Sequence, residues 1–351
     1  MSAAPHTAWT KTLEMTDVSV VVPTHNRRLM LPQAIQSILR QRDVSIELIV
    51  VDDGSNDGTG PWLNQLAIAD QRVKVVHHAV PRLISGARNA GIARATGRWV
   101  AFCDDDDLWA PDKLSAQLAA LRASGARWAC TGVAVVDEGL RIVGHHHVEG
   151  GEVLPALLAS NRIPTGSTVV AECDLLREVG GFDPALRGSE DWDFWIRLAQ
   201  HSPVAAVDRP MIAYRLSRYS LSMNVAPMRA SRLTIARRYA ALAAAHGVAS
   251  DEAGHERYLA KQLLRAGARR EAAAIFAILA FRHGRWRELP RAAAALIAPR
   301  TMNGIGQARA AAAVPASWRR EIELWLRPIR EAAVTAALRP ETWTASREIE
   351  A

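Results

Sequence analysis

The stretch at residues 99–113 constrains the fold of this chain more than any other. It begins with an apolar run at residues 99–103, typical of a strand inside a sheet, and four successive carboxylates follow at residues 104–107. Like charges this close repel one another and raise each other's pKa unless a cation neutralises them. Carboxylate oxygens suit Mg²⁺ or Mn²⁺, and substrate phosphates usually complete the shell. We therefore predict a metal-diphosphate site at this acidic run (residues 104–107); a solvated acidic turn is the alternative.

The segments before the acidic run repeat the order of strand, loop and helix. Apolar, β-branched runs at residues 18–22, 47–51 and 73–77 have the composition of parallel strands that are buried on both faces, and a helical pattern follows each. This order predicts an α/β fold with a Rossmann-like, mostly parallel sheet and helices on both faces. Ligands bind such sheets at the carboxyl ends of strands, so Asp52 and Asp53 should meet the acidic run in one crevice.

The motifs of two common nucleotide-binding folds are missing from the sequence. The first strand leads into Pro23-Thr24-His25-Asn26-Arg27 rather than Gly-x-Gly-x-x-Gly, which disfavours a dinucleotide site. No Gly-Lys-Ser or Gly-Lys-Thr phosphate loop occurs either. Affinity for phosphate would have to come from the metal and from arginines such as Arg88.

Composition and charge divide the chain into two parts. Residues 226–351 are rich in Ala and Arg and carry 21 Arg plus Lys against 11 Asp plus Glu, whereas residues 1–225 carry 22 against 25. We expect a loose tail at residues 1–16, an α/β domain at 17–225 and a basic, α-helical region at 226–351. Helical patterns support the last assignment at residues 230–245, 252–266, 270–282, 286–298 and, with one apolar face, 318–337.

Cysteine use and hydropathy indicate the cellular setting. Cys103, Cys130 and Cys173 have no metal-ligand spacing, and an odd number argues against a disulfide framework. No apolar run approaches the ~20 residues of a membrane span, and the first residues lack the apolar core of a signal peptide. These features predict a reducing, cytoplasmic location.

Several motifs follow one another in order along the first two thirds of the chain. In order they are Val20-Val21-Val22-Pro23-Thr24-His25-Asn26-Arg27, Val50-Val51-Asp52-Asp53-Gly54-Ser55, Ala87-Arg88-Asn89-Ala90-Gly91-Ile92, the acidic run with Leu108-Trp109-Ala110-Pro111-Asp112-Lys113, Gly180-Gly181-Phe182-Asp183 and Glu190-Asp191-Trp192-Asp193. The series resembles the family 2 glycosyltransferases over about residues 17–216. The resemblance implies the GT-A fold and an inverting transfer of sugar from a nucleotide-diphosphate donor to a hydroxyl acceptor, in the synthesis of bacterial cell-surface polysaccharide or glycan.

On the donor side, the resemblance implies a UDP- or dTDP-sugar site with Mn²⁺ or Mg²⁺. Asp106 would ligate the metal together with Asp104, and Asp107 would cap a helix or support its neighbours. Asp53 would accept a hydrogen bond from the base, although it could instead cap the following helix. Arg88 would face the diphosphate, with a structural ion pair as the alternative. The implied nucleotide-binding residues are Pro23, Thr24, His25, Arg27, Asp53, Arg88 and, near the ribose, Asp105.

On the acceptor side, the apolar spacing at residues 188–198 predicts a helix with one buried face. Carboxylates in its first turn are favoured by the helix dipole alone. The resemblance implies in addition that Asp191 is the general base, with Glu190 beside it, and that Trp192 shapes the acceptor pocket. Gly181 would let the backbone approach the donor sugar, because glycine tolerates close contact.

Between these motifs the sequence predicts antiparallel strands at residues 127–136 and 141–146, a strand at 165–171 and a short helix at 175–179. The three histidines at 145–147 fall on alternating faces of a strand, so we expect exposed side chains rather than a metal site. Many relatives carry a histidine two residues after a Tyr-Arg pair, whereas Tyr214-Arg215 is followed by Leu216-Ser217. This departure puts a third metal ligand from that loop in doubt and would leave the metal to the acidic run and the diphosphate.

The basic C-terminal region leaves three hypotheses open. Its arginines and tryptophans suit peripheral contact with the anionic inner face of a membrane, where each basic residue contributes about 1 kcal/mol. Nucleic acid is disfavoured because no nucleic-acid motif is present. The third hypothesis is a helical cap on the α/β domain with a solvated basic face.

Two other functions remain as alternatives. A sugar-nucleotide nucleotidyltransferase would need a Gly-rich, basic loop after the first strand, which residues 23–27 do not supply. A non-catalytic sugar-nucleotide-binding or assembly protein of the same fold would not need an intact acidic run or the Glu190-Asp191 pair. The expected partners are therefore the donor and a glycan or lipid-linked acceptor.

Overall fold

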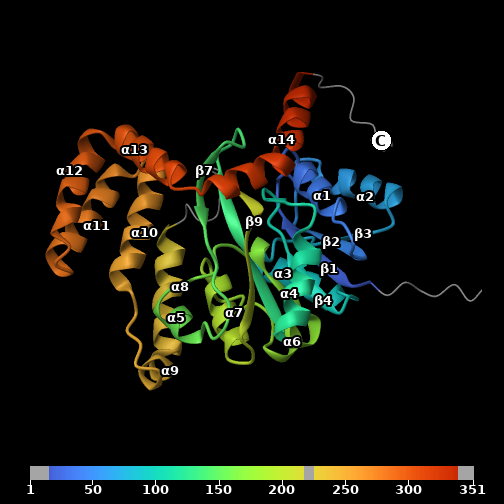
Figure 1. Cartoon of the computed structure of the whole chain (residues 1–351), viewed down its shortest axis with the longest axis horizontal. Coiled ribbons are helices and arrows are strands. Elements are labelled where there is room, and N and C mark those ends of the chain that lie inside the picture. The colour runs from blue at the N-terminus through green and yellow to red at the C-terminus, as the bar shows by residue number, and fades with distance from the viewer. Residues whose placement is uncertain (1–15, 217–224, 339–351) are drawn as a thin grey trace, which may run out of the picture.

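A computed structural model describes residues 16–216 and 225–338, so most of the expected tail at residues 1–16 lies outside the described part. Figure 1 shows a twisted sheet at the centre with helices on both faces and a group of helices beside it. The strands are β1 (Val18–Thr24), β2 (Ile46–Asp52), β3 (Val73–His77), β4 (Trp99–Phe102), β5 (Leu108–Trp109), β6 (Trp128–Val136), β7 (Ile142–His146), β8 (Val170–Glu172) and β9 (Val204–Arg215).

The first half of the sheet is parallel, as the sequence predicts. Strand β1 pairs with β2 and β4, and β2 pairs with β3, all in parallel. Every side chain of β1 and β2 is buried, because helices cover both faces. Val20 points to the face that packs on α1 (Leu31–Leu39), α2 (Thr59–Ala69) and α4 (Lys113–Ser124), and Val21 points to the face covered by α3 (Leu83–Arg94), α6 (Cys173–Glu178) and α7 (Glu190–Ala199).

The second half of the sheet is mixed. Strand β8 runs antiparallel between β4 and β6, β9 runs parallel to β6, and β5 and β7 add antiparallel edges. The strand predicted at residues 165–171 is wrong in its first part, because Gly166–Thr168 form a turn of 3₁₀ helix before β8 begins. The Ser167 hydroxyl explains this turn, since it accepts from the backbone N–H of Asp104 and donates to Asp107.

The C-terminal part is helical, as predicted, with one correction. The helix predicted at residues 230–245 is two helices that meet at Tyr239, whose hydroxyl donates to Asp193 in the α/β part. Short α5 (Leu154–Ala159) lies near this junction (Figure 1). The helices are α8 (Val225–Arg238), α9 (Ala240–Ala245), α10 (Glu252–Arg265), α11 (Arg269–Arg282), the 3₁₀ turn Trp286–Glu288, α12 (Leu289–Ile297), α13 (Pro299–Ala312) and α14 (Ala316–Leu338).

These helices pack in two different ways. Helices α10 to α12 share a core of their own, to the left of the sheet in Figure 1, whereas α14 crosses back over the sheet. The amphipathic face expected at residues 318–337 lies on β6 and β9 through Trp318, Ile322 and Leu326. A Cβ on Gly132 would come within 2.5 Å of the Trp318 ring, so glycine is required beneath it. None of the described helices is long and apolar enough to cross a membrane.

Candidate active site

The carboxyl ends of β1, β2 and β4 meet at one edge of the sheet, because the register sets Val21 beside Phe102 and Thr24 beside Asp52. The loops that follow these three strands line one large cleft with a volume of about 1980 Å³. The prediction that the two acidic clusters share a crevice therefore holds for Asp53 and the acidic run. The far wall of the cleft comes from α10, α12 and α13.

Two carboxylates of the acidic run are held by neighbouring loops. Asp105 accepts a 2.7 Å hydrogen bond from the Thr24 hydroxyl, and Arg27 lies 3.9 Å from its other oxygen. Asp107 is fully buried and accepts from the Ser167 hydroxyl at 2.6 Å and from the backbone N–H of Arg215 at 3.2 Å. Asp107 therefore ties the loop to its surroundings rather than capping a helix.

Asp104 belongs to a buried charge network that spans the site. Arg88 of α3 donates to Asp104 at 2.7 Å through Nη2 and to Glu190 of α7 at 3.2 Å through Nη1. Thr165 also donates to Asp104, at 3.2 Å. Burial alone would lower the pKa of Arg88, but the charges of Asp104 and Glu190 raise it. The structural ion pair considered for Arg88 is thus present, and its contact with a diphosphate stays a prediction.

The acidic run carries negative charge that its surroundings do not fully compensate. Burial, followed by the charge of Asp106, raises the pKa of Asp105 to about 7. Burial, followed by the charge of Asp104, raises the pKa of Asp106 to about 6. Arg27 and Arg215 oppose the shift at Asp106 without cancelling it. A cation at this point would relieve the repulsion.

The residues fit a metal shared with a ligand rather than a complete protein cage. Across residues 16–216 and 225–338, no group of three or more His, Cys, Asp and Glu side chains is arranged to hold a metal ion. Asp104 and Asp106 supply the hard oxygens that Mg²⁺ and Mn²⁺ prefer, and such ions usually take their remaining ligands from water and phosphates. The position two residues after the Tyr214-Arg215 pair, Ser217, lies outside the described residues.

Asp53 faces the cleft at the end of β2. Its Oδ1 accepts from the backbone N–H of Arg82 at 2.8 Å and lies 2.6 Å from Nδ1 of His78, while Nδ1 of His25 lies 2.8 Å from its backbone oxygen. Asp53 does not cap α2, because Gly58 occupies the N-cap position and Asp57 bonds to Thr59. Pro23, Thr24, His25, Arg27 and Asp53 line the cleft together, and their contact with a nucleotide stays a prediction.

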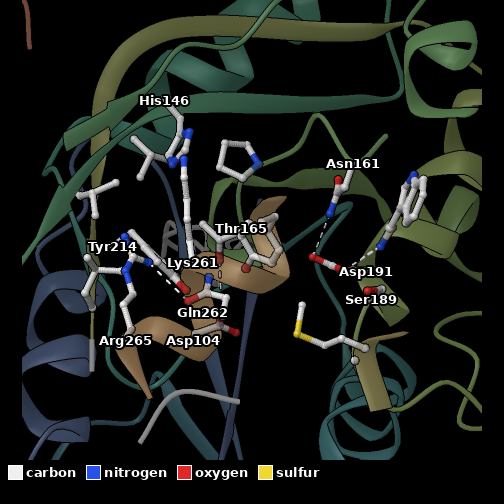
Figure 2. A pocket seen from close by; sticks show the side chains of 18 of the residues that line it. Asp104, His146, Asn161, Thr165, Ser189, Asp191, Tyr214, Lys261, Gln262 and Arg265 are labelled. Carbon is white, nitrogen blue, oxygen red and sulfur yellow. Dashed lines mark hydrogen bonds between the residues drawn. The ribbon is translucent and has the colours of Figure 1, made fainter. Parts of the chain in front are cut away.

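Asp191 lies across the cleft in the first turn of α7. Its Oδ1 accepts from the backbone N–H of Trp192 at 2.7 Å, and the Asn161 amide lies 3.5 Å from Oδ2 (Figure 2). Burial, followed by the charge of Glu190, raises the pKa of Asp191 to about 7. The preceding Ser189 has φ 62°, a left-handed conformation that is uncommon outside glycine and often marks functional sites. This carboxylate can therefore exchange a proton near neutral pH.

The two residues assigned to the sugar and acceptor pocket differ in position. Trp192 lines the cleft, and its indole N–H donates to the backbone oxygen of Leu157 at 2.7 Å. Gly181 is not among the described residues that line the cleft. It has φ 69°, and a Cβ there would come within 2.6 Å of the Asn89 amide, which holds Phe182 by two 2.8 Å hydrogen bonds. The structure thus accounts for Gly181 by local packing.

Sequence reasoning missed several side chains that the fold brings to the site. Arg215 is buried, donates to Gln33 at 2.8 Å and opposes the charge of Asp106. Thr165 and Asn161 come from a segment without a recognisable motif. Of the missed side chains, only Arg215 stood in a motif, the Tyr214-Arg215 pair. The basic face of α10 was assigned to no site, although Figure 2 shows Lys261, Gln262 and Arg265 in the same pocket as Asp104 and Asp191.

Comparison with known families and proteins gives consistent matches. The model of the family described as Glycosyl transferase family 2 matches residues 19–177. The chain is 31% identical over 209 residues to TuaG, a glycosyltransferase assigned to teichuronic acid biosynthesis in Bacillus subtilis (strain 168), covering 59% of this chain and 82% of that protein. It is 28% identical over 214 residues to the UDP-Glc:alpha-D-GlcNAc-diphosphoundecaprenol beta-1,3-glucosyltransferase WfgD of Escherichia coli, covering 59% and 80%.

Some relatives are much longer than the matched part. The chain spans 34% of an uncharacterized glycosyltransferase of Rickettsia felis, at 30% identity over 207 residues. Among solved structures, S. aureus TarS 1-349 in complex with UDP-GlcNAc superposes with a TM-score of 0.54 at 15% identity, covering 94% of this chain and 93% of that one. This likeness concerns the fold, including the sheet and the helices that follow it.

Proposed function

This chain belongs to glycosyltransferase family 2, and we propose that it is an inverting enzyme that transfers sugar from a UDP- or dTDP-sugar to a hydroxyl group of a glycan or lipid-linked acceptor. Relatives named for teichuronic acid biosynthesis and for a diphosphoundecaprenol-linked acceptor support a role in bacterial polysaccharide or glycoconjugate synthesis. The nucleotide-binding residues would be Pro23, Thr24, His25, Arg27, Asp53, Arg88 and Asp105.

The proposed reaction is one displacement. Asp191 takes the proton of the acceptor hydroxyl, and the oxygen forms a bond to the anomeric carbon from the face opposite the diphosphate. The bond between that carbon and the diphosphate oxygen breaks, and the nucleoside diphosphate leaves with the electron pair. Asp104 and Asp106 would hold Mn²⁺ or Mg²⁺, which supplies positive charge to the leaving group.

One observation carries this proposal: the Arg88 guanidinium bridges the two sides of the reaction. It contacts Asp104 beside the expected diphosphate and Glu190 beside Asp191. Arg88 is only 3% exposed, so these contacts form away from bulk water and hold both groups in place before substrate binds. This arrangement couples the position of the base to the position of the leaving group.

The alternative is a non-catalytic sugar-nucleotide-binding or assembly protein. Such a protein would gain nothing from a half-buried carboxylate that titrates near neutral pH, because removing a charge from water costs stability. An enzyme gains a general base, whose best pKa lies near the working pH. The pKa of about 7 at Asp191 therefore favours catalysis.

The test is a donor screen followed by product analysis. UDP- and dTDP-sugars are scored by thermal shift with Mn²⁺, since a ligand at 100 times its Kd stabilises by about 2.7 kcal/mol. The donor that binds is then incubated with glycan and lipid-linked acceptors, and NMR gives the anomeric configuration of the product. We expect inversion. Retention would contradict the single displacement, and binding without turnover on any acceptor would support the binding-protein alternative.

We further propose peripheral contact with an anionic membrane, through one part of the basic C-terminal region. The apolar face of α14 is buried on the sheet. Phe281 and Trp286, at the end of α11 and the turn after it, are instead 65% and 60% exposed and stack edge to face. Exposed Arg282 and Arg287 flank them. Aromatic side chains beside arginines are typical of a membrane interface.

Sedimentation with anionic liposomes at low salt tests this surface. Phe281→Ser/Trp286→Ser should reduce the bound fraction, whereas Leu29→Ser should not, because Leu29 is 92% exposed but lies in the α/β part. Equal binding by the double variant and the unmodified protein would reject the contact.

A further inference from the structure

The cleft continues past Asp191 to the C-terminal helices. Tyr258, Lys261 and Arg265 follow one another along α10 at spacings of three and four residues, which sets them on one face of the helix. All three line the cleft, as does His146 from the edge strand β7. In Figure 2, Lys261 and Arg265 lie on one side of the pocket with His146 near them, and Asp191 lies on the other.

We call Lys261, Arg265 and His146 the basic strip, and its cations differ from others nearby in having no acidic partner. Within the described part of the chain, no carboxylate forms an ion pair with Lys261 or Arg265; Arg265 donates only to the neutral side chain of Gln262. Farther along the same wall, Arg257 and Arg291 are both paired with Glu288. The strip therefore carries positive charge that the protein leaves uncompensated.

The neighbours of the strip add to this charge. Burial, followed by the charges of Arg257, Arg265 and Arg291, lowers the pKa of Lys261. Burial, followed by the charges of His145, Arg265 and Lys261, lowers the pKa of His146. An anion would stabilise the Lys261 and Arg265 cations, and a ring N–H of His146 can donate to it, so the strip is suited to an anion.

Tyr258, which shares its face of α10 with Lys261 and Arg265, links the strip to the Asp191 end of the cleft. The charge of Asp191 contributes to the raised pKa of Tyr258, after the larger effect of burial, so Tyr258 is near the proposed base. Lys261 follows Tyr258 by three residues, a rise of ~4.5 Å along the helix axis.

We infer that the basic strip binds a phosphate group of the acceptor, so that the acceptor is a phosphorylated glycan or glycosyl phosphate. This inference rests on the proposed function, because it assigns the acceptor hydroxyl to Asp191. The donor diphosphate is bound at the strand ends, beside Arg88 and the acidic run. The helical region then selects the acceptor, while the α/β part binds the donor.

Calorimetric titration with glucose 1-phosphate tests the strip, with methyl glucoside as the uncharged probe. Each titration is run with and without saturating UDP, at low and at moderate salt. We expect Lys261→Gln/Arg265→Gln to weaken glucose 1-phosphate binding at least tenfold, to remove its salt dependence and to leave UDP affinity as it was. Arg269→Gln/Arg270→Gln is the matched control, since it removes the same charge from exposed residues of α11 outside the cleft.

Equal glucose 1-phosphate affinity in the strip variant and the unmodified protein would overturn the inference, as would an equal loss of that affinity in the α11 control. A loss of UDP affinity in the strip variant would also overturn it, because it would place the strip in the donor site. Failure of the proposed function is distinguishable. In that case UDP and nucleotide sugars would not bind the unmodified protein at all, while the titration without UDP would still report on the strip.

Discussion

Asp104, on the sheet side of the cleft, is bound by Arg88 and Thr165, whereas Lys261, on the helical side, has no carboxylate partner within the described part of the chain. The charged side chains around Asp104 on the sheet side are thus paired, whereas those of the basic strip on the helical side are not. On the sheet side a buried cation joins two carboxylates, and hydroxyl groups hold Asp105 and Asp107. On the helical side the cations face the cleft unpaired.

This difference matches two tasks that one cleft has to perform. Groups that take part in bond breaking must be held in place before substrate arrives, and networks of buried hydrogen bonds do this. Groups that recognise a charged ligand must be available to it, and an unpaired cation in a cleft is available. We therefore expect changes on the sheet side to affect turnover and folding, and changes on the helical side to affect acceptor binding.

The largest expected effect concerns Asp106. Asp106→Asn should reduce donor hydrolysis and transfer by about 10³-fold or more, because the metal contributes several kcal/mol to transition-state stabilisation. Removal of Mn²⁺ or Mg²⁺ by chelation should have a similar effect on the unmodified protein. The variant should not melt at a lower temperature, since it removes a charge from a repelling group. Near-normal turnover in the variant would show that the acidic run does not bind the metal.

Next in size is the stability difference between the two walls. Arg88→Met leaves Asp104 and Glu190 without their cation in a buried site and should cost about 3–5 kcal/mol of unfolding free energy. Lys261→Met is the matched control on the helical wall and should stay within about 0.5 kcal/mol, because no ion pair is lost. Chemical denaturation measures both. A similar loss of unfolding free energy in the two variants would show that the paired and unpaired cations do not differ in their contribution to stability.

The smallest effect separates a packing role from a sugar-binding role at Gly181. Gly181→Ala and Gly180→Ala both place alanine at positive φ, at a cost of about 1–2 kcal/mol. Only Gly181→Ala adds a clash, with the Asn89 amide, whereas the position at Gly180 is open. Gly181→Ala should therefore melt lower than Gly180→Ala, with the donor KM unchanged in both. A raised donor KM without extra loss of stability would instead favour a role in the sugar pocket.

The part of the fold that the sequence predicts is the part set by local patterns. The parallel strands β1 to β4 alternate with helices, and their apolar runs are visible without the structure. Strand β9 was missed, since it pairs with β6 through contacts 76 residues apart, from Trp128 to Val204. The 3₁₀ turn at Gly166–Thr168 was also missed, because it depends on the bonds that Ser167 makes to the acidic run.

The candidate site likewise contains residues that motifs predict and residues that only the fold brings together. Asp53, the acidic run and Asp191 stand in motifs, and the fold brings them to one cleft. Arg88 was singled out, but its bridge between Asp104 and Glu190 joins residues 16 and 102 positions away and has no local signal. The basic strip brings His146 beside Lys261 from another part of the chain, where neither residue belongs to a motif.

The pH–rate profile of the unmodified protein and Asp191→Asn, with saturating Mn²⁺, tests the central claim most directly. Burial and Glu190 raise the pKa of Asp191 to about 7, and a general base acts only when unprotonated. In the unmodified protein kcat/KM should therefore rise about tenfold per pH unit below about pH 7 and level off above it. In Asp191→Asn turnover should fall about 10²–10⁴-fold, lose this inflection and keep the donor affinity. A variant that turns over normally with the same inflection would contradict the assignment of Asp191 as the base.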